Sequence, residues 1–450
     1  MVSARVPGKP LFRHPAQVIV VAFGTAVVLG TLLLMLPVSR VGPDGAPPVT
    51  ALFTATSAVC VTGLVTVDTP TYWSGFGQAV ILLLIQVGGF GIMTLASLVG
   101  LLLSRRMGLR TRLTAAAETK SLGIGDVRAV LVGVAKVSLL FELLTAVVLT
   151  MRFAVGYGES WDRAVYHGVF HAVSAFNNAG FALYSDNLVG FVADPWICIP
   201  IALAVIVGGL GFPVLFELRR QFGRPRQWSL HTKLTVGTTL SLLVLGTAFM
   251  ISSEWSNPET LGALDAPSRV LAGFFQAVMP RTAGFNSVDY GQMHDGTLLG
   301  VDVLMFIGGG SAGTAGGIKV TTFIILLFVI YAEVRGERHV NAADRRIGER
   351  VQRQALTVAL LSVGLVMVAT LVLLEITDLS TRAVLFESIS AFATVGLSTG
   401  ITADLPSTGQ LVLAVLMFVG RLGPITLVSS LALRETQRRY TLPEGRPLIG

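Results

Sequence analysis

The chain carries one short motif four times, a phenylalanine placed ten residues before a glycine. The four pairs are Phe53 and Gly63, Phe170 and Gly180, Phe274 and Gly284, and Phe386 and Gly396. The glycines are separated by 117, 104 and 112 residues. A motif that recurs at a nearly fixed period is typical of a chain built from copies of one structural unit. We therefore expect a quadruplicated fold.

Three of the four copies share a second feature between their anchors, a Ser-Ala pair at one offset. The pairs are Ser57 and Ala58, Ser174 and Ala175, and Ser390 and Ala391, whereas the third copy has Val278 and Met279. The third copy is therefore the most divergent.

Composition places these copies in a membrane. Hydrophobic residues make up 52% of the 450 residues and charged residues only 13%, which is too apolar for a soluble protein of this length. A spanning helix needs about 20 mostly apolar residues. Stretches of this kind occupy residues 16–36, 76–103, 129–151, 196–216, 234–252, 298–332, 355–374 and 410–433. The sequence thus predicts an all-α membrane protein with eight transmembrane helices.

The net charge of +7 raises the possibility of nucleic-acid binding, but the placement of the charge argues against it. Most of the 33 basic residues fall in loops on the side of the N-terminus. Basic residues concentrate in cytoplasmic loops of membrane proteins. We therefore expect both termini to be cytoplasmic, in a cell inner (plasma) membrane, with no nucleic-acid partner. No small-residue cleavage site follows the first apolar run, so we read it as a retained span.

Each repeat has the order span, short segment, span. The short segments, such as residues 161–176 and 381–392, are about half the length needed to cross, which favours a helix that enters the membrane and turns back, although length alone also permits an interfacial helix. The boundaries that follow are 1–104 for repeat 1, 105–222 for repeat 2, 223–340 for repeat 3, 341–434 for repeat 4, and 435–450 for a cytoplasmic tail.

A loop ending in the motif glycine follows each short segment. Irregular backbone facing lipid would leave its polar groups unsatisfied, so these loops must line water or protein. Glycine allows left-handed backbone angles that turn successive carbonyls to one side. Around one axis, the four loops would form a pseudo-fourfold ring of oxygens. The loops are Val59–Gly63, Asn177–Gly180, Arg281–Gly284 and Thr394–Gly396.

The second spans carry a further glycine motif, which reads GGFG at Gly88, GGLG at Gly208, a long run at Gly308–Gly317 and GRLG at Gly420. Close helix packing through small residues is the simpler reading for the first two copies. The third copy has too many glycines to hold a stable helix. We expect that span to break within the membrane and to line a pathway.

Other candidate sites have structural alternatives. Lys319 ends a glycine-rich run but lacks the flanking Ser or Thr of a phosphate-binding loop, and His167 and His171 have metal-ligand spacing without a glutamate between them. Cys60 and Cys198 are too few for a disulfide framework or a zinc site. Three further ionisable residues lie in apolar or short segments. We expect Lys136 to reach the cytoplasmic interface, whereas Glu142 has no explanation from sequence. For Glu387 we favour support of the fourth short helix over ion binding.

Over nearly its whole length the chain resembles the superfamily of Ktr, Trk and HKT potassium transporters. VCVTGL at Val59, NNAGF at Asn177, TAGFN at Thr282 and TVGLST at Thr394 are similar to its four filter sequences. GGSAGTAGGIK at Gly309 is similar to its intramembrane gating loop, and Arg421 in GRLGP to its pore-facing basic residue. With eight spans and no additional N-terminal pair, the chain looks most like the Ktr membrane subunit, of the KtrB type.

The resemblance implies two functional groups of residues. The first is a potassium-binding filter made of Val59, Cys60, Val61, Thr62, Gly63, Asn177, Asn178, Ala179, Gly180, Arg281, Thr282, Ala283, Gly284, Ala393, Thr394, Val395 and Gly396. The second is a gate within residues 306–319, made of Gly308, Gly309, Gly310, Ser311, Ala312, Gly313, Thr314, Ala315, Gly316, Gly317 and Lys319, together with Arg421. Only the fourth loop keeps the TVG of a channel filter, so a stack of equal ion sites is not expected.

The resemblance also implies the ions and partners. Potassium is the expected ion, with sodium as a candidate activator, and a nucleotide acts only through a partner subunit. The expected assembly is a homodimer in the lipid bilayer on a cytosolic KtrA-type nucleotide-binding ring. The alternative function is a secondary cation carrier with a broken-helix site, which predicts inverted halves where this chain has repeats of one orientation. An intramembrane enzyme would need a nucleophile and base or a metal cluster, so we expect no enzyme.

Overall fold

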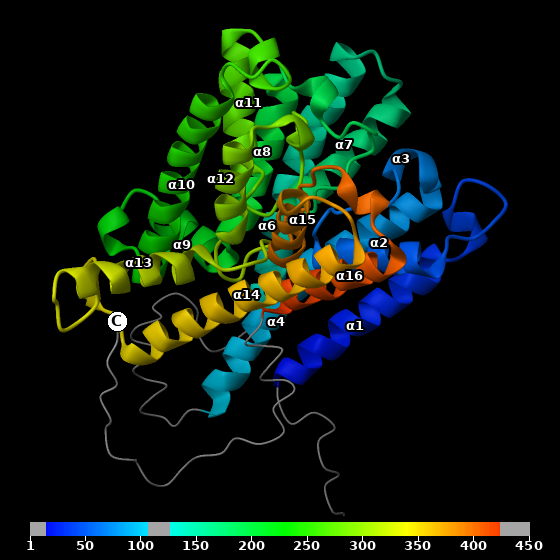
Figure 1. Cartoon of the computed structure of the whole chain (residues 1–450). Coiled ribbons are helices and arrows are strands. Elements are labelled where there is room, and N and C mark those ends of the chain that lie inside the picture. The colour runs from blue at the N-terminus through cyan, green and yellow to red at the C-terminus, as the bar shows by residue number, and fades with distance from the viewer. Residues whose placement is uncertain (1–14, 107–126, 424–450) are drawn as a thin grey trace, which may run out of the picture.

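The computed structural model describes residues 15–106 and 127–423, and most of this part is helical (Figure 1). The ends of the chain, including the predicted tail 435–450 and the last part of the span predicted at 410–433, lie outside the described residues. So do residues 107–126, which make up most of the basic loop between the spans predicted at 76–103 and 129–151.

The helices follow one order four times: a long helix, a short helix and a second helix. The long helices are α1 (Pro15–Leu34), α6 (Val127–Met151), α10 (Leu230–Glu254) and α14 (Glu349–Ile376). The short helices are α2 (Pro48–Cys60), α7 (Trp161–Phe176), α11 (Ala266–Val278) and α15 (Thr381–Ala393). The second helices are α4 (Gly75–Arg106), α8 (Pro195–Leu210) with α9 (Phe212–Gln221), α12 (Asp295–Phe306) with α13 (Val320–Val334), and α16 (Ser407–Leu422).

Helix length and composition test part of the predicted membrane topology. In the described residues, four helices are long and apolar enough to cross a membrane, and they lie in the first position of each repeat. The pair α8 and α9, bent by 101°, adds a fifth if it counts as one span. The remaining second helices include shorter apolar segments, Gly75–Gly91, Val320–Val334 and Ser407–Leu422. The count of eight spans therefore stays a prediction.

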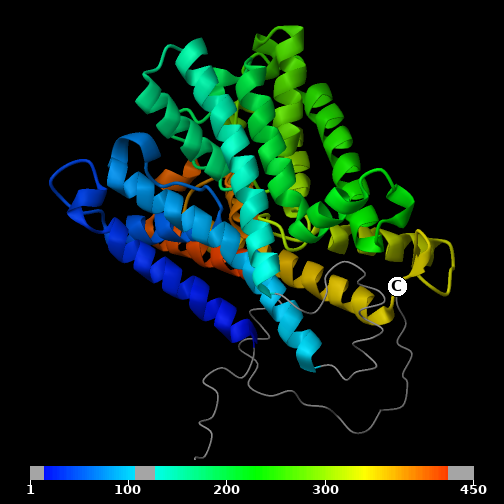
Figure 2. The same cartoon turned by 180° about the vertical axis from the view of Figure 1, so that it is seen from behind.

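The repeats contact one another in a closed cycle. The second helix of each repeat packs on the short helix of the next: α4 on α7, α8 on α11, α12 on α15, and α16 on α2. Figure 1 shows the last of these contacts, where the C-terminal α16 lies against the N-terminal α2. From the opposite side, Figure 2 shows α6 crossing next to α4, which joins the first two repeats.

The motif phenylalanines explain how the short helices are held. Phe53, Phe170 and Phe386 are at most 1% exposed and belong to the apolar core. In the divergent third copy Phe274 is only half-buried, and its neighbour Phe275 is fully buried instead. In a membrane the alternative to burial is contact with lipid, so these rings hold the helices through close packing and not through removal from water. The phenylalanines therefore fix where each short helix sits, and with it the loop that follows.

Outside the helices, a small hairpin that no sequence pattern predicted lies between α13 and α14. Strands β1 (Asn341–Ala342) and β2 (Arg345–Arg346) pair antiparallel. The hairpin buries Val340, Ala342 and Ile347 in a separate apolar cluster with Ala332 of α13. Strands of two residues carry no periodic signal, so a pattern search could not find them.

Candidate functional site

The four loops after the short helices have the same backbone geometry. In each loop, the motif glycine and the residue two positions before it have positive φ. The values are 56° and 93° for Val61 and Gly63, 59° and 68° for Asn178 and Gly180, 74° and 71° for Thr282 and Gly284, and 50° and 94° for Thr394 and Gly396. Side chains other than glycine adopt this region rarely. Four repetitions of a rare conformation indicate that the loops have one common shape.

Backbone hydrogen bonds show the same repetition in three of the four copies. In the first loop, Val61 N donates to Ala58 O at 3.1 Å and Thr62 N to Ser57 O at 2.8 Å. The matching bonds in the second and fourth loops are Asn178 N to Ala175 O, Ala179 N to Ser174 O, Thr394 N to Ala391 O, and Val395 N to Ser390 O. The third loop instead bonds Arg281 N to Val278 O and Ala283 N to Met279 O. The copy that diverges in sequence thus also diverges in structure.

Each motif glycine lies against a carbonyl oxygen of the next loop. A Cβ atom built on Gly63 would overlap Ala179 O, one on Gly180 would crowd Ala283 O, one on Gly284 would crowd Val395 O, and one on Gly396 would overlap Thr62 O. The order runs from repeat 1 through repeat 4 and back to repeat 1. We call these four glycines and four carbonyls the glycine–carbonyl ring. Glycine is required here for space as well as for its backbone angle.

Serine hydroxyls hold two of the ring glycines in place. Ser57 Oγ accepts from Gly63 N, and Ser390 Oγ accepts from Gly396 N, both at 3.1 Å. Ser174 Oγ acts differently and donates to Phe181 O at 2.8 Å. These are the serines of the repeated Ser-Ala pair. The sequence pointed to the position, but the hydrogen bonds give its role.

The side chain of Asn177 in the second loop is hydrogen-bonded to groups on other helices. Asn177 Nδ2 donates to Glu142 Oε1 at 3.2 Å and to Gln86 Oε1 at 2.9 Å. Gln86 Nε2 donates to Glu142 Oε1 at 3.1 Å. Glu142, unexplained by sequence and 6% exposed, therefore joins α4, α6 and the second loop. Its partners are two amides rather than Lys136, six residues away, whose side chain is exposed.

Arg281 occupies in the third loop the position that Asn177 occupies in the second. Its Nη1 donates to Thr239 O at 3.1 Å and its Nη2 to Thr239 Oγ1 at 3.2 Å. The side chain is 8% exposed. Its charge therefore lies on the α10 side of the loop, away from the neighbouring glycine–carbonyl contacts.

The glycine-rich run of the third repeat separates α12 from α13. Gly308 N donates to Ile318 O at 2.8 Å and Val320 N to Gly309 O at 3.0 Å, so the run closes at its base into a loop. We call residues 308–317 the gate loop, after its predicted role.

The gate loop contacts a break in the second span of repeat 2, between α8 and α9. Helix α8 ends at Leu210, and Gly211 has a φ of +92°. The freed carbonyls accept from the gate loop: Gly310 N donates to Gly209 O at 2.7 Å and Thr314 N to Gly208 O at 3.2 Å. In return Phe212 N donates to Ala312 O at 3.3 Å. The GGLG segment is thus both a packing site, where Gly208 lies against Phe176 O, and a helix break.

Two basic side chains bind the gate loop. Arg421, 2% exposed, donates from Nη1 to Thr314 O and from Nη2 to Gly88 O at 3.1 Å. Arg421 therefore contacts a carbonyl of the gate loop, where the third repeat's second span is interrupted. Lys319 Nζ donates to Ala315 O at 2.5 Å and to Gly316 O at 3.3 Å. Its ammonium is therefore hydrogen-bonded to carbonyls of the gate loop itself.

The histidine pair has structural partners. His167 Nδ1 lies 3.0 Å from the Tyr184 hydroxyl and 3.1 Å from Glu159 Oε2. His171 Nδ1 lies 2.7 Å from His167 O, and its Nε2 accepts from Leu183 N at 3.2 Å. Among the described residues, no group of three or more His, Cys, Asp or Glu side chains could hold a metal ion. The pair braces the chain that leaves the second loop.

Glu387 holds the chain that leaves the fourth loop. It is fully buried, and its Oε1 accepts from the Thr402 hydroxyl in the segment that follows the loop. The contact links α15, which carries Glu387, to the segment after the fourth loop, and the preference for support over ion binding stays a prediction. The two cysteines are buried free thiols, with Cys198 Sγ donating to Phe191 O at 3.4 Å.

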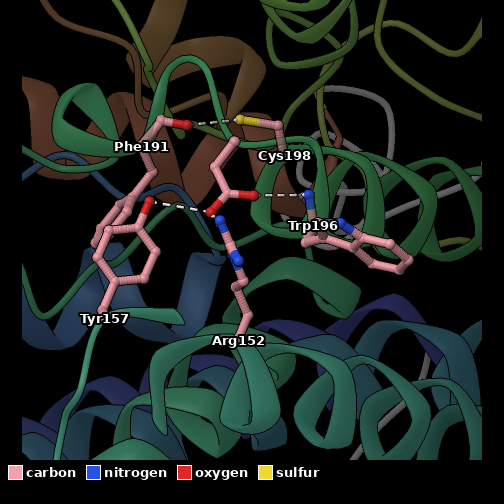
Figure 3. Close-up of polar contacts among 6 residues, drawn as sticks. Arg152, Tyr157, Phe191, Trp196 and Cys198 are labelled. Carbon is pink, nitrogen blue, oxygen red and sulfur yellow. Dashed lines mark hydrogen bonds and ion pairs between the residues drawn. The ribbon is translucent and has the colours of Figure 1, made fainter. Parts of the chain in front are cut away.

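Asp194 links the C-terminal end of α6 to the N-terminal end of α8, where Figure 3 shows Arg152, Tyr157 and Trp196 around one carboxylate. Arg152 Nε donates to Asp194 Oδ2 at 2.6 Å and the Tyr157 hydroxyl to the same oxygen at 3.0 Å. Trp196 N donates to Oδ1 at 2.9 Å, which caps α8. Burial and this carboxylate raise the pKa of Tyr157 to about 12, so the phenol keeps its proton. The cluster is a structural brace.

Comparison with known proteins identifies the family. A family model described as TrkH, cation transport protein, matches residues 7–440. The chain belongs to the TrkH family. Ktr system potassium uptake protein B of Bacillus subtilis (strain 168) is 42% identical over 440 residues, covering 97% of each chain. The protein of the same name from Vibrio alginolyticus is 37% identical over 437 residues, covering 96% of this chain and 94% of that protein.

Two further relatives extend the comparison. The potassium/sodium uptake protein NtpJ of Enterococcus hirae is 34% identical over 443 residues, covering 97% of each chain. The crystal structure of the potassium transporter TrkH from Vibrio parahaemolyticus matches with a TM-score of 0.72 at 17% identity, over 95% of this chain and 86% of that one. The structural match shows a shared fold. With its apolar helices, this TrkH-family chain is a multi-pass membrane protein.

Proposed function

We propose that this TrkH-family chain is the ion-conducting membrane subunit of a potassium uptake system. The observation that carries the proposal is the glycine–carbonyl ring, in which four loops of one shape meet in cyclic order. Carbonyl oxygens held in a ring can replace the hydration shell of a potassium ion. Relatives named as potassium uptake proteins match over nearly the whole chain, which supports the same ion here. Ion passage makes and breaks no covalent bond, so this function is not that of an enzyme.

In this proposal the filter consists of the loop backbones around the ring. Eight spans surround these loops with pseudo-fourfold symmetry, and both termini are cytoplasmic. The gate loop, Lys319 and Arg421 form the barrier beside it. Their hydrogen bonds hold positive charge against the carbonyls of a broken span, and a cation leaving the filter would meet that charge. A buried arginine is costly in an apolar span, which favours a functional reason for its presence.

Sodium and a regulatory subunit complete the proposal. The name of the Enterococcus hirae relative includes both potassium and sodium, which supports sodium as a candidate activator. The Ktr names of two relatives denote a protein of a larger system, which supports a partner for this chain. The partner we propose is a cytosolic nucleotide-binding ring of the KtrA type, on which the chain acts as a homodimer. Arg219, Arg224 and Arg226 are exposed around the end of α9 and offer a basic surface to such a partner.

The direct test is uptake of rubidium by purified chain in proteoliposomes, with and without external sodium and with a candidate ring protein. Potassium-competed uptake that the ring and its nucleotide modulate supports the proposal. Equal uptake of sodium and rubidium would refute the filter. Co-purification from native membranes without any soluble protein, under both ATP and ADP, would refute the regulator alone.

A further inference from the structure

A side-chain hydrogen bond joins the gate loop to the second filter loop. The Asn178 carboxamide lies 2.9 Å from Thr314 Oγ1. With the amide nitrogen on that side, Asn178 also donates to Val205 O at 3.2 Å and to Phe176 O at 3.3 Å. The opposite orientation would set the amide oxygen against both carbonyls, so we assign the nitrogen to this side. Asn178 and Thr314 are both fully buried.

Thr314 is the residue through which three parts of the site meet. Its hydroxyl contacts Asn178, its carbonyl accepts from Arg421, and its N–H donates to Gly208 O. The gate loop also touches the fourth filter loop, where a Cβ on Gly316 would overlap the Thr394 hydroxyl. A gate loop in this position is therefore in direct contact with two of the four filter loops.

We propose that the Asn178–Thr314 hydrogen bond couples the gate to the filter, so that the position of the gate loop sets ion selectivity as well as flux. The inference rests on the proposed function of the two elements. Displacing the loop would remove the Thr314 partner of Asn178. Asn178 has a φ of +59°, and Gly180, two residues on, lies against Ala283 O in the ring. Release of Asn178 would thus loosen one side of the glycine–carbonyl ring.

The geometry allows the coupling to be separated from the gate itself. Arg421 binds the carbonyl of Thr314, whereas Asn178 binds its hydroxyl. Thr314→Val keeps the shape and the carbonyl but removes the hydroxyl, and Thr314→Ser restores it. Asn178→Gly removes the amide and accepts the positive φ without strain. Thr247→Val is the matched control, because the Thr247 hydroxyl donates to Leu243 O at 2.7 Å within its own helix α10 and contacts neither the gate loop nor a filter loop.

The experiment measures the ratio of rubidium to sodium uptake by each variant of the full chain in proteoliposomes. We expect Thr314→Val to lower the ratio by about threefold to tenfold, the factor associated with one net hydrogen bond. Thr314→Ser should restore the wild-type ratio, and Thr247→Val should leave it at the wild-type value. On an Asn178→Gly background, Thr314→Val should cause no further change, because the pair is already broken.

Two results would overturn the coupling. One is a wild-type ratio in Thr314→Val, even if its flux rises. The other is an additive effect of Thr314→Val on the Asn178→Gly background, which would mean that the two residues act separately. If Thr314→Val does not fold, Asn178→Gly alone must lower the ratio for the coupling to stand. Failure of the wild-type chain to prefer rubidium over sodium would instead refute the proposed function.

Discussion

Gly396 lies so close to the Thr62 carbonyl oxygen that a Cβ atom would overlap it, and this contact joins the last repeat to the first. The two residues are far apart in the sequence, but they close a cycle that the other three glycines continue. Such a closed arrangement tolerates little change at any one member. The same reasoning gives predictions for the groups that hold the cycle in place.

Glu142 should be needed to position the second filter loop. Glu142→Leu would leave the Gln86 amide without its acceptor and would remove one of the three acceptors of Asn177 Nδ2, at a cost of about 1–3 kcal/mol for a buried group left unsatisfied. We expect lower thermal stability in detergent together with reduced rubidium uptake. Glu375→Leu is the matched control, because Glu375 is exposed near the end of α14. Wild-type uptake and stability in Glu142→Leu would contradict the assigned role.

Glu254 should matter for stability. It is fully buried, and it accepts hydrogen bonds from Asn257 Nδ2 and Thr260 Oγ1, both at 2.6 Å, and from His294 N at 3.0 Å. Glu254→Gln would set an amide NH₂ against one group of donors, and we expect a loss of about 2–3 kcal/mol. Thermal unfolding measures it, with exposed Glu333→Gln as the control. Equal unfolding temperatures would show that the hydrogen bonds to Glu254 are dispensable.

Arg421 should restrain flux. Arg421→Ala removes the donors to Thr314 O and Gly88 O, and deletion within Gly309–Gly316 removes the loop itself. We expect either change to raise rubidium uptake about threefold to tenfold, since each lost hydrogen bond is worth ~1 kcal/mol, and to loosen nucleotide control. Arg382→Ala is the control, because Arg382 pairs with Asp295 away from the gate loop. Unchanged or lower flux in well-folded protein from both variants would argue against a gate.

The sequence predicted those features that depend on local backbone geometry and recur at the same spacing in each repeat. The motif glycines and the short helices could be found because each copy shows the same spacing, and Trp161–Phe176 forms a helix over the predicted residues. The partners of Glu142 and Arg281 could not be found, because they come from Gln86 and Thr239 in other helices and no local pattern links them.

The break at Gly211 illustrates a second limit. GGLG at Gly208 closely resembles GGFG at Gly88, yet α4 runs on through Gly88 while α8 ends at Leu210. The difference lies in the neighbour, because the gate loop supplies donors for the carbonyls of Gly208 and Gly209. Glycine only lowers the cost of a break, and tertiary contacts decide whether one forms.

The central claim is that the glycine–carbonyl ring selects potassium, and Gly63→Ser tests it most directly. A serine there would be strained at a φ of +93° and would overlap Ala179 O. Gly237→Ser is the control, because Gly237 of α10 faces open space. The measurement is the ratio of rubidium to sodium uptake in proteoliposomes. We predict that Gly63→Ser lowers it on the order of tenfold, a change of ~1.4 kcal/mol in relative barrier height, while Gly237→Ser keeps it. A wild-type ratio in folded Gly63→Ser protein would contradict the account.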